Sequence, residues 1–518
     1  MRALAFLWAL FVRAPMRFLG RTLVVLAGLS LVFVWGFVPV AVLLGLVLGT
    51  GLWLRIRRHR KWATLHGSAR FASRRDLDGH GLRGRRGLIL GRVGRTFLRF
   101  DRPGHLLTFA PTRSGKGAGS IIPNLLDHPG SVFVVDPKGE NHAASSAFRE
   151  SIGRVHAIAP FDRQVEASRF NPVDFIRVGE AEEIDDATLI TDMLVVSSGP
   201  ETFWDSEAKA LITCLLLYVA HACTGPERTL SHVWTLLMRN QDGFEDLLEE
   251  VLAIDHAGIA AMARGFSQKE IRERSAVIST AQTHMKIWKS PLLARATEAS
   301  DFMMEDLKRR PTSLYLILPP ELLETYRSFV RLFVGLALVA TTRARTARRE
   351  PVVFFLDETA ALGRMEPIEA GIGWLAGYGA SLWLFFQDLD QLMQIYPRWR
   401  SMIANCAVRQ AFNVTDYATA AELSNMLGTR TVIAPSISRA TAGPLSLLPN
   451  HFSTSEGLQA RKLMTPDEVM AMPTTHQLLF VQACPPIRAR KIRWFAEEPF
   501  RARKALAERR TIARKDES

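Results

Sequence analysis

The apolar positions of this chain follow two patterns that predict two kinds of structure. Short apolar runs alternate with helix-like segments from about 106 to 159 and again from 313 to 482. Fully apolar strands of this kind are typical of a sheet that is covered by helices on both faces. From 180 to 310, in contrast, apolar residues recur at the 3.6-residue period of helices. The sequence therefore predicts an α/β fold whose two halves form one sheet around an inserted all-α domain.

The boundaries of single elements follow from the same runs. We expect strands at 87–90, 97–100, 106–110, 131–135, 155–159, 313–318, 352–356, 381–386, 408–412 and 478–482. The periodic segments of the insertion are 184–194, 203–222, 230–252 and 267–307. Ser, Ala and Pro are frequent in residues 434–460, which predicts a mobile loop there.

A third pattern, a long run without charge, lies near the N-terminus. Arg21 is the only charged residue between 18 and 54, and a single helix of residues 22–54 would be roughly 50 Å long. The hydrocarbon core of a bilayer is about 30 Å thick, so two transmembrane helices that turn near residues 36–39 fit better. Arginines flank the run on both sides, which places both of its ends in the cytoplasm.

We therefore expect residues 1–61 to be a membrane anchor with two transmembrane helices. A cleaved signal peptide is the alternative, but the apolar region is too long for one and basic residues follow it directly. Residues 3–12 are apolar too, which leaves open whether they form an interfacial helix or a further span.

Net charge changes this picture little. The formal charge of +14 comes mainly from the two ends, because 1–61 contain nine basic and no acidic residues and 488–518 contain eleven basic and five acidic ones. The central chain is close to neutral, so basicity alone does not indicate a nucleic-acid-binding protein. For the basic C-terminal tail, residues 496–518, three roles remain open: binding acidic partners, binding anionic lipid headgroups, or disorder.

The four cysteines, Cys214, Cys223, Cys406 and Cys484, are scattered along the chain. They lack the C-x-x-C and Cys/His spacings of zinc sites. We interpret them as core thiols in a reducing compartment and expect no zinc.

The strand at 106–110 runs into a loop that can bind phosphate. Its sequence, LLTFAPTRSGKG, contains Gly115, which permits close backbone approach, and Lys116, which can reach the β- and γ-phosphates. We predict that the nucleotide is bound by Pro111, Thr112, Arg113, Ser114, Gly115, Lys116, Gly117 and Ala118.

This loop departs from the P-loop pattern at two positions. Ala110 stands in place of the first glycine, and Gly117 replaces the Ser or Thr that binds Mg²⁺. Ser120, Thr112 or a water could take over as the metal ligand. On the loop alone, a glycine-rich turn that binds nothing remains an alternative.

A second apolar strand, 352–356, ends in two adjacent carboxylates, Asp357 and Glu358. Asp357 can hold the Mg²⁺ and its waters, and Glu358 can polarise an attacking water. Such a pair also occurs at strand ends without any catalytic role. Together with the loop, however, the pair predicts a nucleotide hydrolase that uses Mg²⁺.

Two further strand ends carry polar residues that would face the same sheet edge. Asp136 begins a charged turn, and Gln387 follows the strand at 381–386. Asp136 could sense the phosphate or simply belong to a polar turn, and Gln387 could sense the γ-phosphate or cap the following helix. Arg409 and Arg364 are candidates for an arginine that reaches a neighbouring subunit's nucleotide.

Taken in order, these motifs resemble the coupling proteins of type IV secretion and bacterial conjugation, the TraG family. The similarity spans about residues 62–495. It rests on PTRSGKG at 111–117, IPNLL at 122–126, DPKGEN at 136–141, Phe203-Trp204, LDE at 356–358, GYG at 377–379, Gln387, LGT at 427–429, LMTPDEVM at 463–470 and PPIRA at 485–489. In that family Lys-Gly stands in place of Lys-Ser/Thr, as it does here.

The resemblance implies an ATPase of the bacterial inner membrane with most of its chain in the cytoplasm. Its RecA-like domain, residues 62–179 and 311–495, would assemble six subunits around a channel, and its all-α domain, residues 180–310, would receive cargo. The implied partners are single-stranded DNA bound to a relaxase, effector proteins and other subunits of the secretion system. Ala376 stands where the family commonly has an arginine, so the identity of any trans-acting arginine stays open.

Two other functions fit parts of the sequence. A double-stranded DNA pump of the septal translocase kind is also membrane-anchored and RecA-like, but it usually adds a winged-helix module for which residues 495–518 are too few. A membrane receptor with a degenerate nucleotide site would dock cargo on its helical domain without hydrolysis. Gly117 and Ala376 favour this second alternative.

Overall fold

The computed structural model describes residues 64–196, 202–344, 350–439 and 452–516, together with single positions between 23 and 53. They belong to two compact units, one formed by residues up to 69 with 428–463 and one formed by 70–427 with 464–518. Among the described residues, no helix is long and apolar enough to cross a bilayer. The transmembrane hairpin and the segment 3–12 lie outside the described residues apart from those single positions, so both stay predictions.

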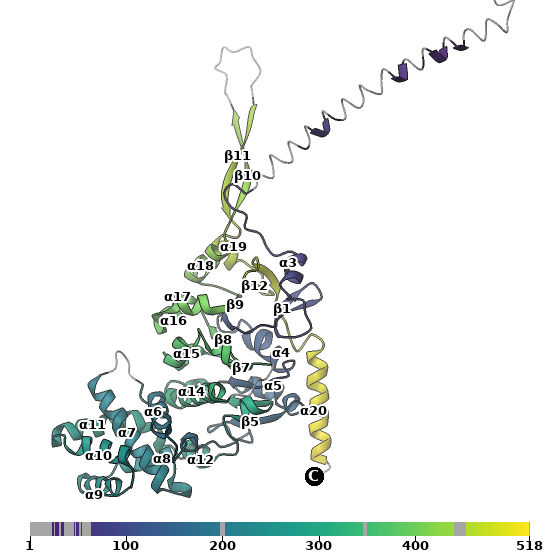
Figure 1. The fold of residues 1–518 in the computed structure, drawn as a ribbon. Coiled ribbons are helices and arrows are strands. Elements are labelled where there is room, and N and C mark those ends of the chain that lie inside the picture. Colours follow the sequence, from purple (N-terminus) through teal and green to yellow (C-terminus); the bar gives the residue numbers. More distant parts are fainter. Residues whose placement is uncertain are drawn as a thin grey trace, which may run out of the picture. The chain divides into compact units, whose positions relative to one another are not determined.

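The larger unit is built on a mixed sheet of eleven strands in the order β2-β1-β13-β12-β9-β3-β8-β7-β4-β6-β5 (Figure 1). The strands are β1 (Leu88–Val93), β2 (Thr96–Phe100), β3 (His105–Phe109), β4 (Val132–Val135), β5 (Arg154–Ile158), β6 (Thr312–Leu316), β7 (Val352–Leu356), β8 (Ala380–Phe386), β9 (Cys406–Ala411), β12 (His476–Val481) and β13 (Ile487–Arg490). From β9 to β5 all neighbouring strands pair in parallel. The remaining strands, β12, β13, β1 and β2, extend the sheet by antiparallel pairs.

This order confirms that two separated parts of the chain build one sheet. Strands β3 to β5 precede the helical insertion, strands β6 to β9 follow it, and strands of the first set lie between strands of the second. Every position of β3, β4, β6, β7 and β8 is buried, as the uninterrupted apolar runs predict. Strand β13 was not predicted, because its four residues, IRAR, alternate buried and exposed positions and carry two charges.

Helices cover both faces of the sheet (Figure 1). On one side lie α4 (Ile122–Leu125), α5 (Glu140–Arg149) and α20 (Phe500–Asp516), and on the other lie α14 (Arg327–Arg343), α16 (Leu389–Ile395) and α17 (Trp399–Asn405). Further helices of this unit are α3 (Arg74–Gly79), α15 (Glu366–Gly371), α18 (Tyr417–Leu427) and α19 (Pro466–Met470). Because both faces are covered, the loops at the carboxyl ends of the parallel strands are where a ligand site can form.

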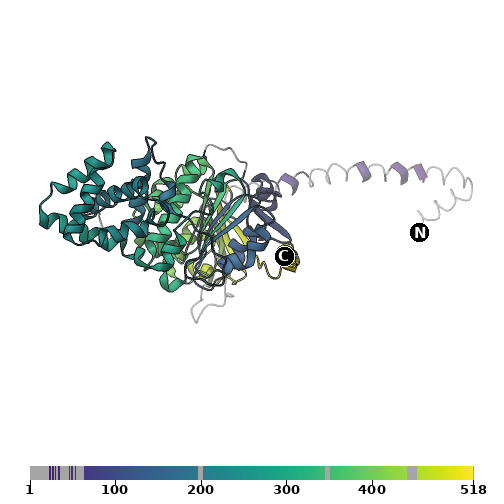
Figure 2. The same ribbon diagram turned by 90° about the horizontal axis from the view of Figure 1, so that it is seen from below.

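The described residues of the insertion form helices and their connections without a strand, as predicted. Its helices gather at one end of the larger unit (Figure 2) and are α6 (Glu183–Leu194), α7 (Phe203–Ala222), α8 (Leu230–Leu237), α9 (Gln241–Leu252), α10 (Ala257–Ser267), α11 (Ile271–Met285), α12 (Pro291–Ala296) and α13 (Asp306–Arg309). Two of the long periodic segments are broken. Asn240 caps α9 by accepting the Gly243 N–H at Oδ1 (3.0 Å), and Pro291 begins α12 because it tolerates only the first turn of a helix.

The predicted mobile loop at 434–460 is wrong for its described parts, which belong to the smaller unit. Strand β10 (Thr429–Arg439) pairs antiparallel with β11 (Phe452–Lys462), from Thr429↔Lys462 to Arg439↔Phe452. The strands are hard to recognise because none of their residues 429–434 and 457–462 is buried, so these positions need no apolar alternation. Pro435 is tolerated because both strands are edge strands.

Much of the predicted basic tail forms helix α20 and packs on the larger unit. Phe500 is completely buried, and its ring lies edge-on to that of Phe97 with 5.5 Å between centroids. Arg503 forms an ion pair with Asp127 and donates to the carbonyl of Leu126 at 2.7 Å. Disorder is therefore excluded for the described part of the tail. One of its basic residues, Arg503, helps to hold α20 against the rest of the larger unit.

Replacing Phe500 by Ala is expected to destabilise the larger unit by about 3–5 kcal/mol, the usual effect of deleting a buried aromatic side chain. Because Phe500 is the buried anchor of α20, amide hydrogen exchange in residues 500–509 should become much faster. The matched control is Leu506→Ala, which removes an apolar side chain from the same helix at a position that is 54% exposed. Equal exchange in the two variants would contradict the anchoring role.

Candidate functional site

Strand order brings the predicted site residues to one edge of the sheet. Strand β8 lies between β3 and β7, with Phe109 opposite Phe386 and Leu356 opposite Leu384. The backbone N–H of Ala110 also bonds the carbonyl of Phe386 (2.9 Å). The phosphate loop, the twin acids and Gln387 therefore leave neighbouring strands at the same carboxyl edge, where ligands bind in parallel sheets.

Lys116 contacts both members of the acidic pair. Its Nζ lies 3.0 Å from Asp357 Oδ1 and donates a short hydrogen bond to Glu358 Oε1. Burial lowers the pKa of Lys116, but the charges of Asp357 and Glu358 outweigh burial and leave that pKa above its ordinary value. Burial also raises the pKa of Asp357, although Lys116 opposes this. The structure thus places a fixed positive charge between two carboxylates.

Glu358 adopts an unusual backbone conformation at the start of a 3₁₀ turn. Its φ is 60° and its ψ is 49°, in the left-handed region that a glutamate rarely occupies. Residues held in this way cost about 1–3 kcal/mol and cluster at functional sites. The side chain of Gln387 lies beside it, with Nε2 3.5 Å from Glu358 Oε2, whereas Asp388 caps the following helix. Gln387 is therefore not the helix cap.

The loop conformation accounts for one departure from the P-loop pattern. Positive φ angles occur at Arg113 (58°) and Gly115 (85°), but not at Ala110, so the missing first glycine is not needed for backbone freedom. After Lys116 the chain forms a π-helical turn, Gly117–Ile121, that leads into α4. A Cβ on Gly119 would lie only 3.3 Å from the carbonyl of Ile492, so the C-terminal segment passes close to this turn.

A buried polar network holds β3 beneath the loop. Trp383 Nε1 donates to Thr108 Oγ1 (2.8 Å), which donates to Gln410 Oε1 (2.8 Å). Ser120 Oγ donates to the same Gln410 oxygen (3.3 Å), and Ser120 is only 2% exposed. Its hydroxyl is thus used inside the protein, which argues against Ser120 as the replacement metal ligand.

Asp136 directly follows β4 at the same sheet edge and is 1% exposed. Its Oδ2 accepts the N–H of His142 (2.8 Å), and its Oδ1 accepts from Asn141 Nδ2 (3.1 Å). Burial raises the pKa of Asp136 to about 6, and the charge of Asp357 adds to this effect. Asp136 is therefore more than a surface turn residue, because it organises the start of α5 next to the acidic pair.

Lys491 is a site residue that sequence reasoning missed. It follows β13, and its Nζ donates to the Ser114 carbonyl (2.8 Å) and to Asn413 Oδ1 (3.1 Å). The ring of Phe412 lies 4.8 Å away. Burial lowers the pKa of Lys491 to about 8, and the charge of Arg493 lowers it too. No local motif signals this contact, because Lys491 reaches the loop only through the pairing of β13 with β12.

The two arginines that were candidates for reaching a neighbouring subunit's nucleotide differ in their hydrogen bonding. Arg364 donates to Glu369 Oε2 (2.7 Å), which occupies its guanidinium. Arg409 lies half-buried on β9, and its Nε is buried without a hydrogen-bond partner among the described residues. Neither residue contacts Lys116 or the acidic pair in the described chain.

Metal-type donors also gather in the helical insertion. Glu183, His221 and His256 have ligand atoms within 4.8 Å of one another. Glu183, however, accepts hydrogen bonds from both histidines and from the Gly179 N–H (2.8 Å). His256 Nδ1 in turn accepts the Ile259 N–H (3.0 Å). We interpret this group as a satisfied network that joins α6, α7 and α10.

Two solved structures share the fold of this chain. The bacterial conjugative coupling protein TrwB, in its unbound form, aligns with a TM-score of 0.63 at 16% identity and covers 82% of this chain and 92% of that chain. TrwB in complex with ADP and Mg²⁺ aligns with a TM-score of 0.61, covering 82% and 94%. The chain thus shares the fold of this coupling protein.

Sequence comparison places the chain within this class. A family model described as "Type IV secretory system Conjugative DNA transfer" matches residues 70–515, so the chain belongs to this family of coupling proteins. A conjugal transfer protein TraG of Escherichia coli is 29% identical over 500 residues, which cover 85% of this chain and 78% of TraG. A VirD4 protein of Rhizobium radiobacter is 28% identical over 467 residues, covering 86% and 65%. The resemblance to the TraG family is confirmed.

Proposed function

We propose that this protein is a membrane-anchored hexameric ATPase that couples substrates to a type IV secretion channel and powers their transfer. Single-stranded DNA bound to a relaxase, effector proteins or both would be the cargo. The anchor would lie in the bacterial inner membrane, with most of the chain in the cytoplasm. The observation that carries this proposal is the position of Lys116 between Asp357 and Glu358, on the fold of a coupling protein.

The residues of the site would divide the work of ATP hydrolysis. Residues 111–118 would bind the phosphates, and Lys116 would turn from the acidic pair toward the transferring phosphate. Asp357 would hold Mg²⁺, which supplies positive charge that offsets the phosphate charge. Glu358 would position the attacking water and accept its proton, and Gln387 would respond to the phosphate state through its contact with Glu358.

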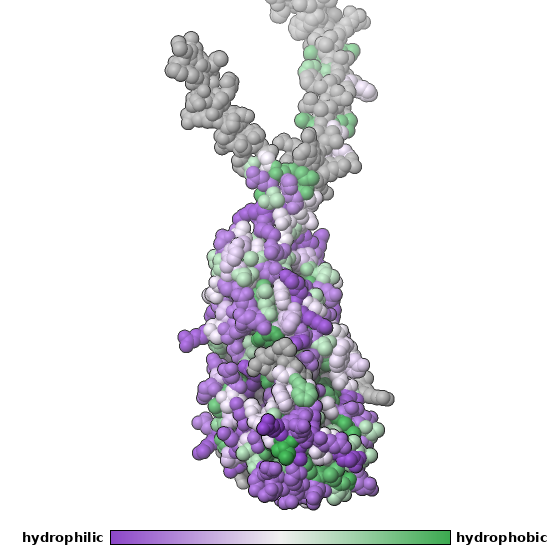
Figure 3. Space-filling model, turned by 90° about the vertical axis from the view of Figure 1, so that its left-hand side faces the viewer, coloured by the Kyte–Doolittle hydropathy of each residue, from purple (hydrophilic) through white to green (hydrophobic). Residues whose placement is uncertain are grey.

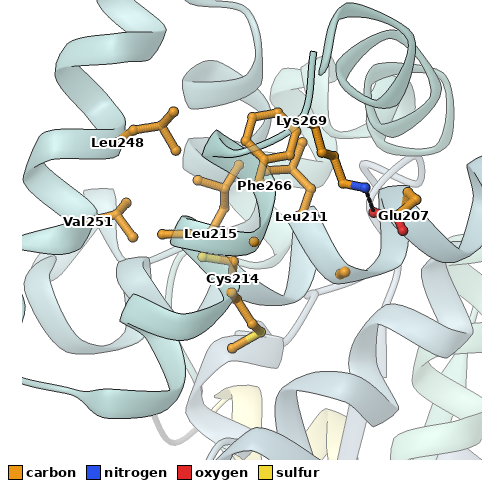
Figure 4. Close-up of a pocket in the computed structure, with 12 residues that line it drawn as sticks. Glu207, Leu211, Cys214, Leu215, Leu248, Val251, Phe266 and Lys269 are labelled. Carbon is orange, nitrogen blue, oxygen red and sulfur yellow. Dashed lines mark ion pairs between the residues drawn. The ribbon is translucent and has the colours of Figure 1, made fainter. Parts of the chain in front are cut away.

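The helical insertion would receive the cargo. Helices α7, α9 and α10 line a pocket of about 320 Å³ whose walls are mostly apolar and include the ion pair between Glu207 and Lys269 (3.1 Å; Figure 4). Large apolar residues are also exposed on this module, including Phe203, Trp204 and Ile271. Figure 3 shows apolar surface among polar residues on this part of the molecule. Exposed apolar patches of this kind support protein docking.

ATP hydrolysis by the purified full-length protein tests the proposal. Stimulation by single-stranded DNA is expected for a coupling protein, whereas a preference for duplex DNA would favour the septal pump. Absence of turnover with either DNA would favour the non-hydrolysing receptor.

Nucleotide affinity should fall as the pH rises through about 8, because Lys491 loses its proton there. Phosphate favours the charged form of this lysine, so binding is strongest below its lowered pKa and weakens above it. Between pH 7 and 9 we expect a several-fold loss, because a partly exposed charge contributes on the order of 1 kcal/mol. Fluorescence titration with an ATP analogue measures the change. Lys491→Arg stays charged over this range and should show a smaller loss; identical pH profiles would contradict the role of Lys491.

A further inference from the structure

The phosphate loop lacks the hydroxyl that usually follows its lysine, because residue 117 is glycine. In the P-loop pattern a Ser or Thr at that position binds Mg²⁺. Ser120 does not replace it, since its buried hydroxyl donates to Gln410 on the sheet. With Ser120 excluded, Thr112, which is exposed, or another oxygen must act if the protein is to provide a second ligand besides Asp357.

Asn141 brings an unused oxygen to this place. It lies in the first turn of α5, is 3% exposed, and its Oδ1 is buried without a hydrogen-bond partner among the described residues. A Cβ on residue 117 would lie 3.6 Å from this oxygen. The Asn141 oxygen is therefore beside the space into which a serine hydroxyl at position 117 would project.

Asp136 determines which end of the Asn141 amide is free. Asn141 Nδ2 donates to Asp136 Oδ1 (3.1 Å), and Asp136 Oδ2 accepts the N–H of His142 (2.8 Å). A carboxylate only accepts, so the amide nitrogen must face Asp136 and Oδ1 must face away from it. A buried acceptor that is held in place without a partner is unfavourable and points to a ligand.

We propose that Asn141 Oδ1 is a protein ligand of the Mg²⁺ that accompanies the nucleotide, in place of the hydroxyl missing at position 117. This inference rests on the proposed nucleotide site and adds a residue to it. Mg²⁺ takes oxygen ligands, and an amide oxygen supplies one without adding charge to a site that already holds Asp357 and Asp136. Those two carboxylates are close enough for their charges to interact.

The test measures metal binding rather than turnover. The full-length protein in detergent is saturated with a non-hydrolysable ATP analogue and titrated with Mn²⁺, whose free concentration is read by electron paramagnetic resonance. We expect Asn141→Ala to weaken Mn²⁺ binding by about 10- to 100-fold, the usual loss when a group that supports a metal site is removed. Nucleotide binding in EDTA should change much less, because Lys116 and the loop remain.

A rescue variant separates a ligand from a structural residue. Adding Gly117→Ser to Asn141→Ala restores an oxygen beside the same position and should recover most of the lost Mn²⁺ affinity. The matched control is Asn171→Ala. Asn171 is also 3% exposed, but its Oδ1 accepts the Val173 N–H (3.0 Å) and its Nδ2 donates to the Arg228 carbonyl (2.7 Å). Its loss should leave Mn²⁺ affinity unchanged.

Unchanged Mn²⁺ affinity in Asn141→Ala would overturn the proposal. An equal loss of metal-free nucleotide binding that Gly117→Ser does not rescue would overturn it as well, because Asn141 would then act only by supporting Asp136. If the parent protein did not bind the analogue at all, the proposed ATPase would fail together with this ligand. Normal binding by the parent protein with an unchanged Asn141→Ala variant would reject the ligand alone.

Discussion

Replacing Lys116 by Ala is expected to lower ATP hydrolysis by about 100- to 1,000-fold, as when another preorganised charge-stabilising donor is removed. Among the described residues, Lys116 is the only cation that contacts Asp357 or Glu358. Without it, the two carboxylates would repel the phosphates and each other. Phosphate release by the full-length protein in detergent, at saturating ATP, measures the effect.

A matched lysine in the helical insertion controls for general damage. Lys209 forms an ion pair with Asp192 (3.0 Å) and lies on α7, far along the chain from the loop. Lys209→Ala should retain parental turnover, and both variants should still be recovered in the membrane fraction. Hydrolysis by Lys116→Ala at the parental rate would refute the nucleotide site.

The second large effect is expected for Glu358→Gln, which keeps the shape of the side chain but removes its charge. Hydrolysis should fall by about 100- to 10,000-fold, because a general base contributes this much to a proton transfer. Nucleotide binding should persist, since Lys116 and the loop are intact and an amide oxygen can still accept from Lys116. Comparing single-turnover hydrolysis with the affinity for an ATP analogue separates the two steps.

Glu366→Gln is the control for this variant. Glu366 lies at the start of α15 with a side chain that is 81% exposed, so losing its charge should leave both hydrolysis and binding unchanged. If Glu358→Gln lost nucleotide affinity and turnover to the same degree, Glu358 would be a structural residue. Its left-handed backbone would then require a different explanation.

Local patterns were enough to predict most of the strands and the insertion. The run VVFFL at 352–356 forms β7 with the same limits, and the described residues of 180–310 form helices and their connections without a strand. These predictions succeeded because a strand buried on both faces appears as an uninterrupted apolar run, and a helix buried on one face shows a 3.6-residue period. Both patterns are visible in neighbouring residues. The same reasoning failed for β10 and β11, because their residues 429–434 and 457–462 are not buried and show no apolar pattern.

In the candidate site, too, the sequence indicated which residues are involved, and the tertiary structure determined which of them are in contact. The residue types of the loop at 111–118 and of Asp357-Glu358 indicated phosphate and metal chemistry before any fold was known. That Gln387 faces Glu358 follows from the place of β8 between β3 and β7. Lys491 and Asn141 enter the site through contacts with residues that are distant in sequence.

The sequence by itself determined the class of fold, the helical insertion, the chemistry of the loop and the acidic pair, and membership of the coupling-protein family. The tertiary structure decided that Lys116 lies between the two acids, that β13 carries Lys491 to the loop, and that the free oxygen of Asn141 lies beside Gly117. The physical reason is that periodicity and motif composition are properties of adjacent residues. Contacts between strand ends, in contrast, depend on strand order, which long-range pairing alone establishes.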